Sequence, residues 1–399
     1  MIERLSVTDT HRDYRATVRE FCESAVAPHI EEHESAGTFP RAVVEQVAEA
    51  GYVGVQYPSE VGGAGLDYRS YAISMEELSR CWKLVGGAVN IAVALVGYPL
   101  ATWGADWQQA DWLRPINEGD YVPAVAITEP EAGSDAATLE TTARPAGEPE
   151  GELEAGPIDA DRADEELVLN GHKVWSTNAS VADFLLVLAR TGGEGASGLS
   201  LVGVPQPNDR DGLEVVRDIP CLEGDAAIET ELRFDDVRVP AENIVGEAGR
   251  GFRYMMEGLD IGRIGTAAQG VGVAQAALDA SREHADEREQ FGQPIREFQG
   301  IGFKLADMAT DVEAARLLTL AAADQRDRDE RVTKRAAMAK TFATDAAMDA
   351  ATEAIQIHGA RGYSKDYPVE RYFRVAKGMQ IYEGTNEINR LVVARRLYE

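Results

Sequence analysis

Three short segments of the chain combine acidic, hydroxyl or aromatic side chains with turn-forming residues, a composition typical of sites that bind ligands or do chemistry. They are residues 126–135 (AITEPEAGSD), 173–178 (KVWSTN) and 380–390 (QIYEGTNEINR). Each supplies a different capacity: a turn rich in glycine and hydroxyl groups, an aromatic ring beside hydroxyl groups, and a carboxylate beside glycine. Together, such groups could bind a ligand and move a proton.

Glu383 is the candidate catalytic base, and Gly384 follows it directly. A carboxylate in a site that excludes water has its pKa raised toward neutrality, which improves it as a base for taking a proton from carbon. The glycine after it lets the backbone approach a ligand closely. On the residues alone, the commoner interpretation is an acid near the N-terminus of a helix.

The other two segments are candidates for ligand binding. Thr128, Gly133 and Ser134 lie in and after the end of a predicted strand, and such a turn suits contact with phosphate groups and with the edge of a ring system. Its ordinary interpretation is a β-turn in which serine is a turn former. Trp175 and Thr177 lie on a second predicted strand and at its exit, where a tryptophan is ordinarily a core residue.

The elements that must position these segments change twice along the chain. Residues 1–122 and 241–399 repeat apolar side chains at helical spacing, and several long helices in the second range indicate a bundle. Residues 123–240 contain short β-rich runs punctuated by Gly, Asn and Asp, as in an antiparallel β domain. The expected strands are 122–128, 167–176, 184–189, 199–204, 213–219 and 228–239. One bundle helix is predicted from the apolar stripe Ile301, Leu305, Met308, Val312 and Ala315.

Composition excludes several classes of partner. The net charge is −29, so the surface repels nucleic acid and anionic membranes. Only seven of the basic residues are lysine, and scarce lysine with excess acid predicts adaptation to high salt. Residues 144–166 are expected to be a solvated insertion between strands. The apolar run 84–102 contains Gly, Asn and Pro and is interpreted as a buried helix with turns, not as a membrane span.

Cysteine usage and the first residues predict a cytoplasmic protein. Cys22, Cys81 and Cys221 are few, far apart and odd in number, which indicates a reducing compartment without a disulfide framework or a zinc site. The chain begins MIERLSVTD, which lacks the basic and apolar regions of a signal peptide. His29 and His33 do not form an H-E-x-x-H motif, so no metal site is expected.

Taken in order, the three segments resemble those of the acyl-CoA dehydrogenase family. Four more stretches support the resemblance, residues 57–66 (YPSEVGGAGL), 234–240 (FDDVRVP), 288–292 (REQFG) and 356–363 (QIHGARGY). The resemblance covers nearly the whole chain. It implies an α+β fold with a helical N-terminal domain (1–122), a middle antiparallel β-barrel-like domain (123–240) and a C-terminal four-helix bundle (241–399).

The resemblance implies roles for individual residues. Glu383 would take the α proton of an acyl-CoA thioester while a hydride leaves the β carbon for N5 of FAD, and the Glu383 N–H would help polarise the thioester carbonyl. Trp175 would lie beside the flavin ring and Thr177 near its N5. The other residues implied in FAD binding are Ala126, Ile127, Thr128, Gly133, Ser134, Ser176, Arg288, Phe291, Gln299, Gln356, Ile357, His358, Gly359, Ala360, Thr385, Asn386 and Glu387.

The resemblance also implies an oligomer, a tetramer in the family. Arg288, Phe291 and the turn 356–360 would reach the FAD of a neighbouring subunit, so that each cofactor site draws on two chains. Family members often carry two adjacent glycines in that turn, and this chain has Gly359 followed by Ala360.

Substrate binding is assigned to Ser134, Asp260, Arg263 and Gly384. Asp260 and Arg263 are three residues apart, so an ion pair within one helix is their simpler interpretation. Some branched-chain members place the base in this helix, but the nearby position here is Gly262, which keeps the base at Glu383.

The resemblance implies electron transfer from the reduced flavin to an electron-transfer flavoprotein. The alternatives are an acyl-CoA oxidase-type flavoenzyme and a non-catalytic flavin-binding homologue; retention of Glu383 argues against the second. No charged residue occurs between Lys83 and Asp106, part of which lines the acyl tail in the family. This favours an unsubstituted aliphatic acyl group over a dicarboxylate.

Overall fold

The computed structural model describes residues 7–147 and 166–398. The predicted insertion at 144–166 and the N-terminal segment therefore lie mostly outside the described residues. The chain divides into two compact units, each built from separate stretches of sequence. We call residues 33–65 and 88–262 the sheet unit, and residues 1–32, 66–87 and 263–399 the bundle unit.

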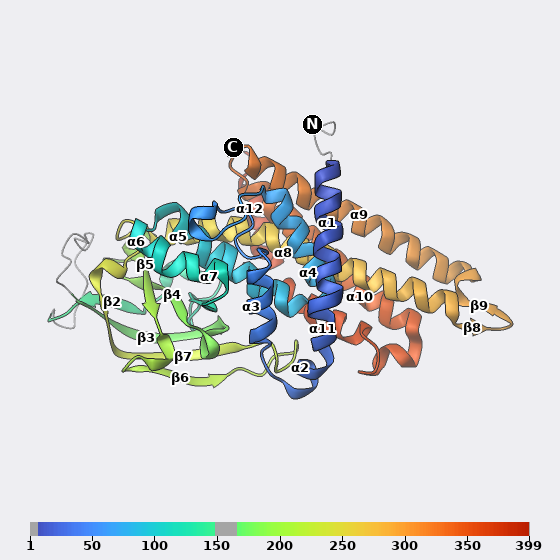
Figure 1. The fold of residues 1–399 in the computed structure, drawn as a ribbon, viewed down its shortest axis with the longest axis horizontal. Coiled ribbons are helices and arrows are strands. Elements are labelled where there is room, and N and C mark those ends of the chain that lie inside the picture. The colour runs from blue at the N-terminus through green and yellow to red at the C-terminus, as the bar shows by residue number, and fades with distance from the viewer. Residues whose placement is uncertain (1–6, 148–165, 399) are drawn as a thin grey trace. The chain divides into compact units, whose positions relative to one another are not determined.

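The sheet unit is built on one curled sheet with the strand order β1-β4-β2-β3-β7-β6, with β5 also paired to β4 (Figure 1). The strands are β1 (Pro123–Ala126), β2 (Thr142–Pro145), β3 (Glu166–Thr177), β4 (Phe184–Arg190), β5 (Leu199–Pro205), β6 (Leu213–Asp218) and β7 (Glu229–Pro240). All six expected strands are present, and β2 was not predicted.

The expectation of an antiparallel sheet needs one correction. The pairs β2–β3, β3–β7, β4–β5 and β6–β7 are antiparallel, but β1 and β2 both lie parallel to β4, with Ala126 opposite Val187 and Thr142 opposite Arg190. Parallel neighbours need a long connection between them, and here β2 and β3 lie between β1 and β4 in the sequence. Alternation along a single strand reveals its buried face but not the direction of its neighbour.

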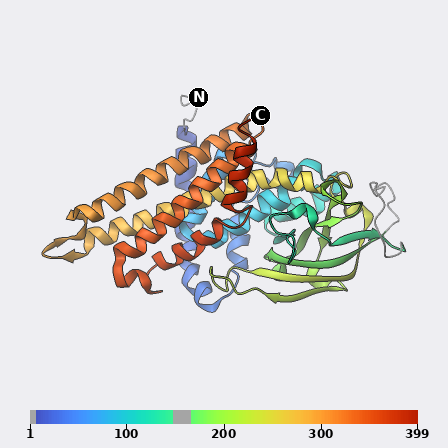
Figure 2. The ribbon, with the colours of Figure 1, turned by 180° about the vertical axis from the view of Figure 1, so that it is seen from behind.

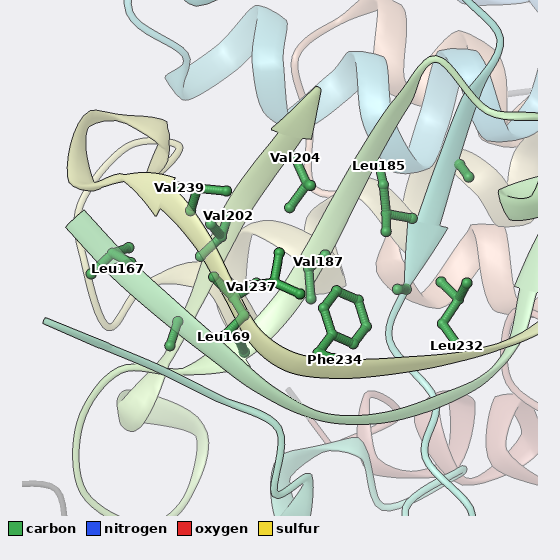
Figure 3. Packing of buried hydrophobic residues seen from close by; sticks show 14 of the residues in the cluster. Leu167, Leu169, Leu185, Val187, Val202, Val204, Leu232, Phe234, Val237 and Val239 are labelled. Carbon is green, nitrogen blue, oxygen red and sulfur yellow. The ribbon is translucent and has the colours of Figure 1, made fainter. Parts of the chain in front are cut away.

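The core of the sheet unit lies inside the curl of the sheet (Figure 3). Leu167 and Leu169 of β3 meet Leu232, Phe234 and other inward-facing side chains of β7. Each such side chain contributes about 1.5–3 kcal/mol when fully buried. The alternating pattern of β7 was readable from the sequence because its other face carries Glu, Arg and Asp.

Short helices complete the sheet unit. They are α3 (Arg41–Glu49), α5 (Tyr98–Trp103), α6 (Asp106–Gln108) and α7 (Arg114–Glu118), with π-helical turns at Ile91–Gly97 and Gln109–Leu113. Trp112 packs on Phe184 of β4, with ring centroids 4.9 Å apart. Strand β4 is buried along both faces, from Phe184 to Ala189, and Trp112 covers Phe184 at its start.

The bundle unit consists of long helices (Figure 2). Its longer helices are α1 (Asp9–Phe21), most of α4 (Tyr68–Asn90), the later part of α8 (Gly251–Glu287), α9 (Gln299–Asp327), α10 (Thr333–His358), α11 (Val369–Met379) and α12 (Asn386–Arg395). A Cβ on Gly270 of α8 would stand 2.8 Å from the Ala343 carbonyl oxygen of α10, so small residues let these helices approach closely. The predicted stripe on α9 is confirmed as inward-facing: Met308, Val312 and Ala315 are buried, and Ile301 and Leu305 pack partly buried against the core.

Helix α4 (Tyr68–Asn90) begins an apolar helical run that continues to Trp103. By length and composition this run could cross a membrane, but 89% of its apolar window is buried inside the protein, as in the core helix of a globular domain. The interpretation of residues 84–102 as a buried helix is confirmed.

Candidate active site

A β-bulge presents Trp175 to the surface of the sheet unit. The register between β3 and β7 shifts between Lys173 and Ser176, and Trp175 within the bulge has the left-handed φ of 59°. Its side chain is 53% exposed, while Lys173 and Ser176 on either side are fully buried. Left-handed backbone costs about 1–3 kcal/mol outside glycine and is concentrated at functional sites. Trp175 is therefore not a core residue, and its ring is available to a ligand.

A buried ion pair fixes the backbone next to this ring. Lys173 Nζ donates to the Ile127 carbonyl oxygen at 2.8 Å and to Glu129 Oε1 at 2.9 Å. The same carboxylate accepts backbone N–H groups from Glu140 at 2.7 Å and Thr141 at 2.8 Å. The segment from Ile127 to Glu129 is thus tied to β3 and to the chain leading into β2.

Burial acts on the pKa values of the two partners in opposite directions. Burial lowers the pKa of Lys173 to about 8, partly offset by the Glu129 carboxylate. Burial alone would raise the pKa of Glu129, but the Lys173 charge and the backbone N–H groups hold it below its usual value. Both partners are ionised at neutral pH, and the pair is a fixed anchor under the turn.

The predicted ligand-binding turn lies directly on this anchor. Glu129 and Ala132 exchange backbone hydrogen bonds of 3.1 Å, and the Val174 N–H donates to the Thr128 carbonyl oxygen at 2.9 Å. Gly133 and Ser134 follow on the surface, and a Cβ on Gly133 would meet nothing within 4 Å. This exposed turn beside an exposed tryptophan has room for a ligand.

The remaining predicted residues of the sheet unit differ in exposure. Ala126 is buried in the sheet core and Ser176 is fully buried, so a ligand could meet only their backbones. Thr177 Oγ1 lies 3.0 Å from both carboxylate oxygens of Glu229 on β7. Asp260 lies partly exposed on the first turns of α8.

In the bundle unit, Glu383 and Gly384 form a left-handed pair, with φ of 54° and 80°. Arg263 Nε donates to the Glu383 carbonyl oxygen at 3.3 Å, and Lys340 Nζ donates to the Gly384 carbonyl oxygen at 2.9 Å. Asn389 Nδ2 donates to the same Gly384 oxygen at 2.7 Å. Two cationic side chains thus hold successive carbonyls of the loop that carries the candidate base.

Helix α12 begins just after this loop. Thr385 is its N-cap, and its hydroxyl accepts the Ile388 N–H at 3.2 Å. The neighbouring Asn386 is buried, and its amide is engaged by Lys340, Thr344 and Asp345 within the protein. Glu387 is exposed in the first turn of the helix. The commoner interpretation of a Glu before Gly-Thr-Asn is therefore partly right, since a helix does start here, but Glu383 itself lies outside it.

Two tyrosines lie close to the candidate base, Tyr71 in space and Tyr382 next to it in the sequence. Tyr71 of α4 is fully buried, and burial together with the nearby Glu383 charge raises its pKa well above 10. Tyr382 lies under the ammonium of Lys83, 5.0 Å from ring centroid to Nζ, and its hydroxyl donates to Gln269 Oε1 at 3.4 Å. Tyr71 thus lies close enough to Glu383 to sense its charge, and Glu383 itself is partly buried.

Arg288 and Phe291 lie on a small hairpin, which sequence reasoning treated as a charged loop. The strands are β8 (Glu289–Gln290) and β9 (Gln293–Pro294), and Phe291 and Gly292 at the turn have φ of 56° and 82°. These dihedrals are typical of the two-residue hairpin turn. Phe291 is 95% exposed.

The end of α10 lies near this hairpin. His284, one helical turn before Arg288, stacks on His358 with ring centroids 4.2 Å apart. Burial and the charge of its neighbours lower the pKa of His284 to about 4, so this pair is neutral near pH 7. Gln356, Gly359 and Ala360 are exposed, Ile357 and His358 are buried, and Gln299 is exposed at the start of α9.

Sequence reasoning missed Lys173 and Lys340. Both are fully buried, which is rare for lysine. A signal was present at Lys340, which interrupts an Ala-rich helical run (residues 336–347, AAMAKTFATDAA) on its inner face. Among residues 7–147 and 166–398, no cluster of His, Cys, Asp and Glu could hold a metal ion, and the three cysteines are free thiols.

Comparisons with known proteins cover nearly the whole chain. Family models described as the N-terminal, middle and C-terminal domains of acyl-CoA dehydrogenase match residues 8–120, 124–237 and 249–398. The mitochondrial short-chain specific acyl-CoA dehydrogenase of Mus musculus is 39% identical over 396 residues, covering 99% of this chain and 92% of that protein.

Two solved structures are similar over the same length. Butyryl-CoA dehydrogenase from Megasphaera elsdenii has a TM-score of 0.90 and 36% identity, covering 99% of both chains. A chain in a structure of the electron transferring flavoprotein of Acidaminococcus fermentans has a TM-score of 0.91 and 39% identity, covering 98% of both chains.

Proposed function

This chain belongs to the acyl-CoA dehydrogenase family of FAD-dependent oxidoreductases, and from that we propose that it converts an acyl-CoA to the trans-2-enoyl-CoA with Glu383 as the base. The observation that carries the proposal is the left-handed Glu383–Gly384 pair, whose carbonyls are held by Arg263 and Lys340. Backbone strain maintained by buried charges is expected where a carboxylate must be aimed at a substrate.

The surface of the sheet unit fits FAD. Trp175 offers an exposed aromatic ring, and the turn at Thr128, Gly133 and Ser134 offers hydroxyl and backbone N–H groups with open space above Gly133. When bound, FAD supplies the acceptor for the hydride that leaves the β carbon. The role of the protein in this unit is to hold the turn, and the Lys173–Glu129 ion pair does so from beneath.

Glu383 would take the α proton onto its carboxylate. Its own N–H, on the left-handed loop, would donate to the thioester carbonyl and stabilise the negative charge that develops there. Ser134, Asp260, Arg263 and Gly384 are proposed to contact the CoA thioester. For Arg263 the structure adds a second role, because its guanidinium donates to the Glu383 carbonyl.

Further FAD contacts are proposed to come from a neighbouring subunit. Arg288, Phe291, Gln299 and the residues 356–360 lie at one end of the bundle unit, and Phe291 is almost fully exposed. An exposed aromatic ring on a rigid hairpin is typical of an interface. We propose a homotetramer on this basis. Thr385, Asn386 and Glu387 are also proposed to lie near FAD. Asn386 would act through the loop, because its side chain is hydrogen-bonded to Lys340, Thr344 and Asp345.

The acyl group is proposed to be short and aliphatic. Residues 84–105 contain no charged side chain that could bind a second carboxylate. The similar proteins include a short-chain specific and a butyryl-CoA enzyme. The proposed electron acceptor is an electron-transfer flavoprotein, supported by the similarity to a chain from such a structure.

The cellular setting and the domain division are proposals as well. The three free cysteines favour a reducing, cytoplasmic location, and the acidic composition favours function at high salt. Boundaries near residues 122 and 240 would separate the N-terminal, middle and C-terminal domains.

Glu383→Gln tests the proposed function. We expect the purified variant to keep its yellow flavin and lose anaerobic reduction by butyryl-CoA by at least about 1000-fold, since the base contributes at this scale. Near-normal reduction would move the base to another residue. A panel of acyl-CoAs with a dye acceptor, including glutaryl-CoA, tests the substrate class, and fast turnover with oxygen alone would indicate an oxidase.

A further inference from the structure

Lys340 contacts the loop of the candidate base through two neutral acceptors. Its Nζ donates to the Gly384 carbonyl oxygen and to Asn386 Oδ1, both at 2.9 Å. Both acceptors are neutral, and the side chain is fully buried in α10. A buried ammonium is costly unless it is paired or hydrogen-bonded, so a lysine kept here needs a reason.

The charged groups that face Lys340 come from three helices and one loop. In order of their influence they are Glu383 in the loop, Arg263 on α8, Asp345 on α10 and Glu387 on α12. The strongest favourable charge is thus the candidate base itself. Burial lowers the pKa of Lys340 to about 8, and the Glu383 charge opposes this.

We propose that Lys340 is a positioning residue for the Glu383–Gly384 loop and that its ammonium is a buried positive charge that acts with Arg263 to keep Glu383 ionised. The inference rests on the proposed function of Glu383 as the base. Lys340 does not need to touch the substrate. Its hydrogen bonds hold the loop, and its charge acts on the carboxylate electrostatically.

The two effects have different consequences. Hydrogen bonds to Gly384 and Asn386 keep Gly384 left-handed, so their loss misplaces the carboxylate and lowers the limiting rate of flavin reduction. The positive charge stabilises the ionised form of Glu383, so its loss raises the pKa of the base. Tyr71, which also faces Glu383, is neutral in this range and cannot replace the charge.

Three variants separate these effects in the FAD-loaded enzyme. Lys340→Met removes charge and donor, Lys340→Gln removes the charge but keeps an amide donor, and Lys334→Met removes an exposed lysine from the same helix. The readout is the rate of anaerobic flavin reduction by butyryl-CoA as a function of pH. Reduction rises with pH as the base ionises, and its midpoint reports the pKa of the base in the complex.

We expect the midpoint to rise by about one pH unit or more in both Lys340 variants, the scale of an opposite charge at close range. The limiting rate should fall further in Lys340→Met than in Lys340→Gln. Lys334→Met should behave as the unmodified enzyme. If Glu383→Gln no longer allows flavin reduction, so that Glu383 is the base, unchanged midpoints in both Lys340 variants would overturn the proposal. Retained reduction in Glu383→Gln would instead refute the proposed function.

The variant Glu383→Gln provides a second test, which does not require the Lys340 variants to fold. Coupling between two charges is reciprocal, so removing the Glu383 charge lowers the pKa of Lys340. A lysine with a depressed pKa in the folded state gains stability as pH rises through that value. Above about pH 8 both proteins should gain stability equally, but in thermal unfolding between pH 6.5 and 8 Glu383→Gln should gain on the unmodified enzyme. A constant gap would overturn the proposal.

Discussion

Lys173 in the sheet unit and Lys340 in the bundle unit are both buried cations, but their hydrogen-bond partners differ. Both are fully buried, and each donates to a backbone carbonyl of a loop that carries candidate site residues. Burial lowers the pKa of each to about 8. Lys173 has its own carboxylate in Glu129, whereas the hydrogen-bond acceptors of Lys340 are neutral.

This difference separates a structural anchor from a functional charge. Glu129 neutralises Lys173 locally, so the pair exerts little field on its surroundings and acts by fixing Ile127 and Thr128. The hydrogen-bond acceptors of Lys340 do not cancel its charge, and the carboxylate with the largest influence on that charge is Glu383. A buried lysine with neutral acceptors next to a candidate base is thus a better indicator of chemistry than one in a complete ion pair.

The largest expected effect comes from breaking the complete pair. Glu129→Gln leaves Lys173 as an uncompensated buried charge and weakens the acceptor of two backbone N–H groups. The free energy of unfolding should fall by about 3–5 kcal/mol. Urea unfolding at pH 7 measures it. Glu131→Gln, exposed in the same turn, is the matched control, and an equal loss in both would mean that the pair is not the anchor.

The pH dependence of stability should reveal Lys173 directly. Its pKa is about 8 in the folded protein and about 10.4 in an unfolded chain. Between these values the unfolded state binds more protons, so this group adds stability as pH rises above 8. The unmodified enzyme should gain up to about 3 kcal/mol on Lys173→Met between pH 7 and 10. A gap in unfolding free energy that stays constant over this range would contradict the depressed pKa. Lys334→Met should show no such trend.

Removing a neutral partner of Lys340 should cost less. Asn386→Ala takes away one acceptor of the ammonium and the bonds to Thr344 and Asp345. The Gly384 carbonyl remains, so we expect a loss of about 1–3 kcal/mol in the free energy of unfolding. Guanidinium unfolding of the FAD-loaded enzyme measures it. A loss as large as that of Glu129→Gln would erase the distinction between the two lysines.

The two regions also differ in how much of them the sequence predicts. Strands such as β7 and the stripe on α9 follow from alternation and helical spacing, because these patterns record which side chains meet the core. The parallel pairing of β1 with β4 and the short strand β2 depend on contacts between segments far apart in the sequence. No local pattern in the chain encodes them.

For the candidate site, the sequence predicts residue types better than conformations. Glu383 and Trp175 were identified from their segments and a family resemblance. Their left-handed backbones, and the buried lysines that maintain the loops, depend on packing in three dimensions. A bulge that exposes Trp175 reverses the ordinary expectation for a tryptophan on a strand, and it could not have been inferred from β propensity.

The smallest expected effect concerns the backbone strain that both regions share. Glycine adopts left-handed φ without penalty, so Trp175→Gly should raise the free energy of unfolding of the apoenzyme by about 1 kcal/mol while weakening FAD binding. Val174→Gly, at the neighbouring position without a left-handed φ, should lower it by about 0.5–1 kcal/mol. Glu383→Gly is expected to stabilise the bundle unit similarly. If Trp175→Gly and Val174→Gly destabilise equally, the bulge carries no strain, and the exposed ring of Trp175 alone would mark the cofactor surface.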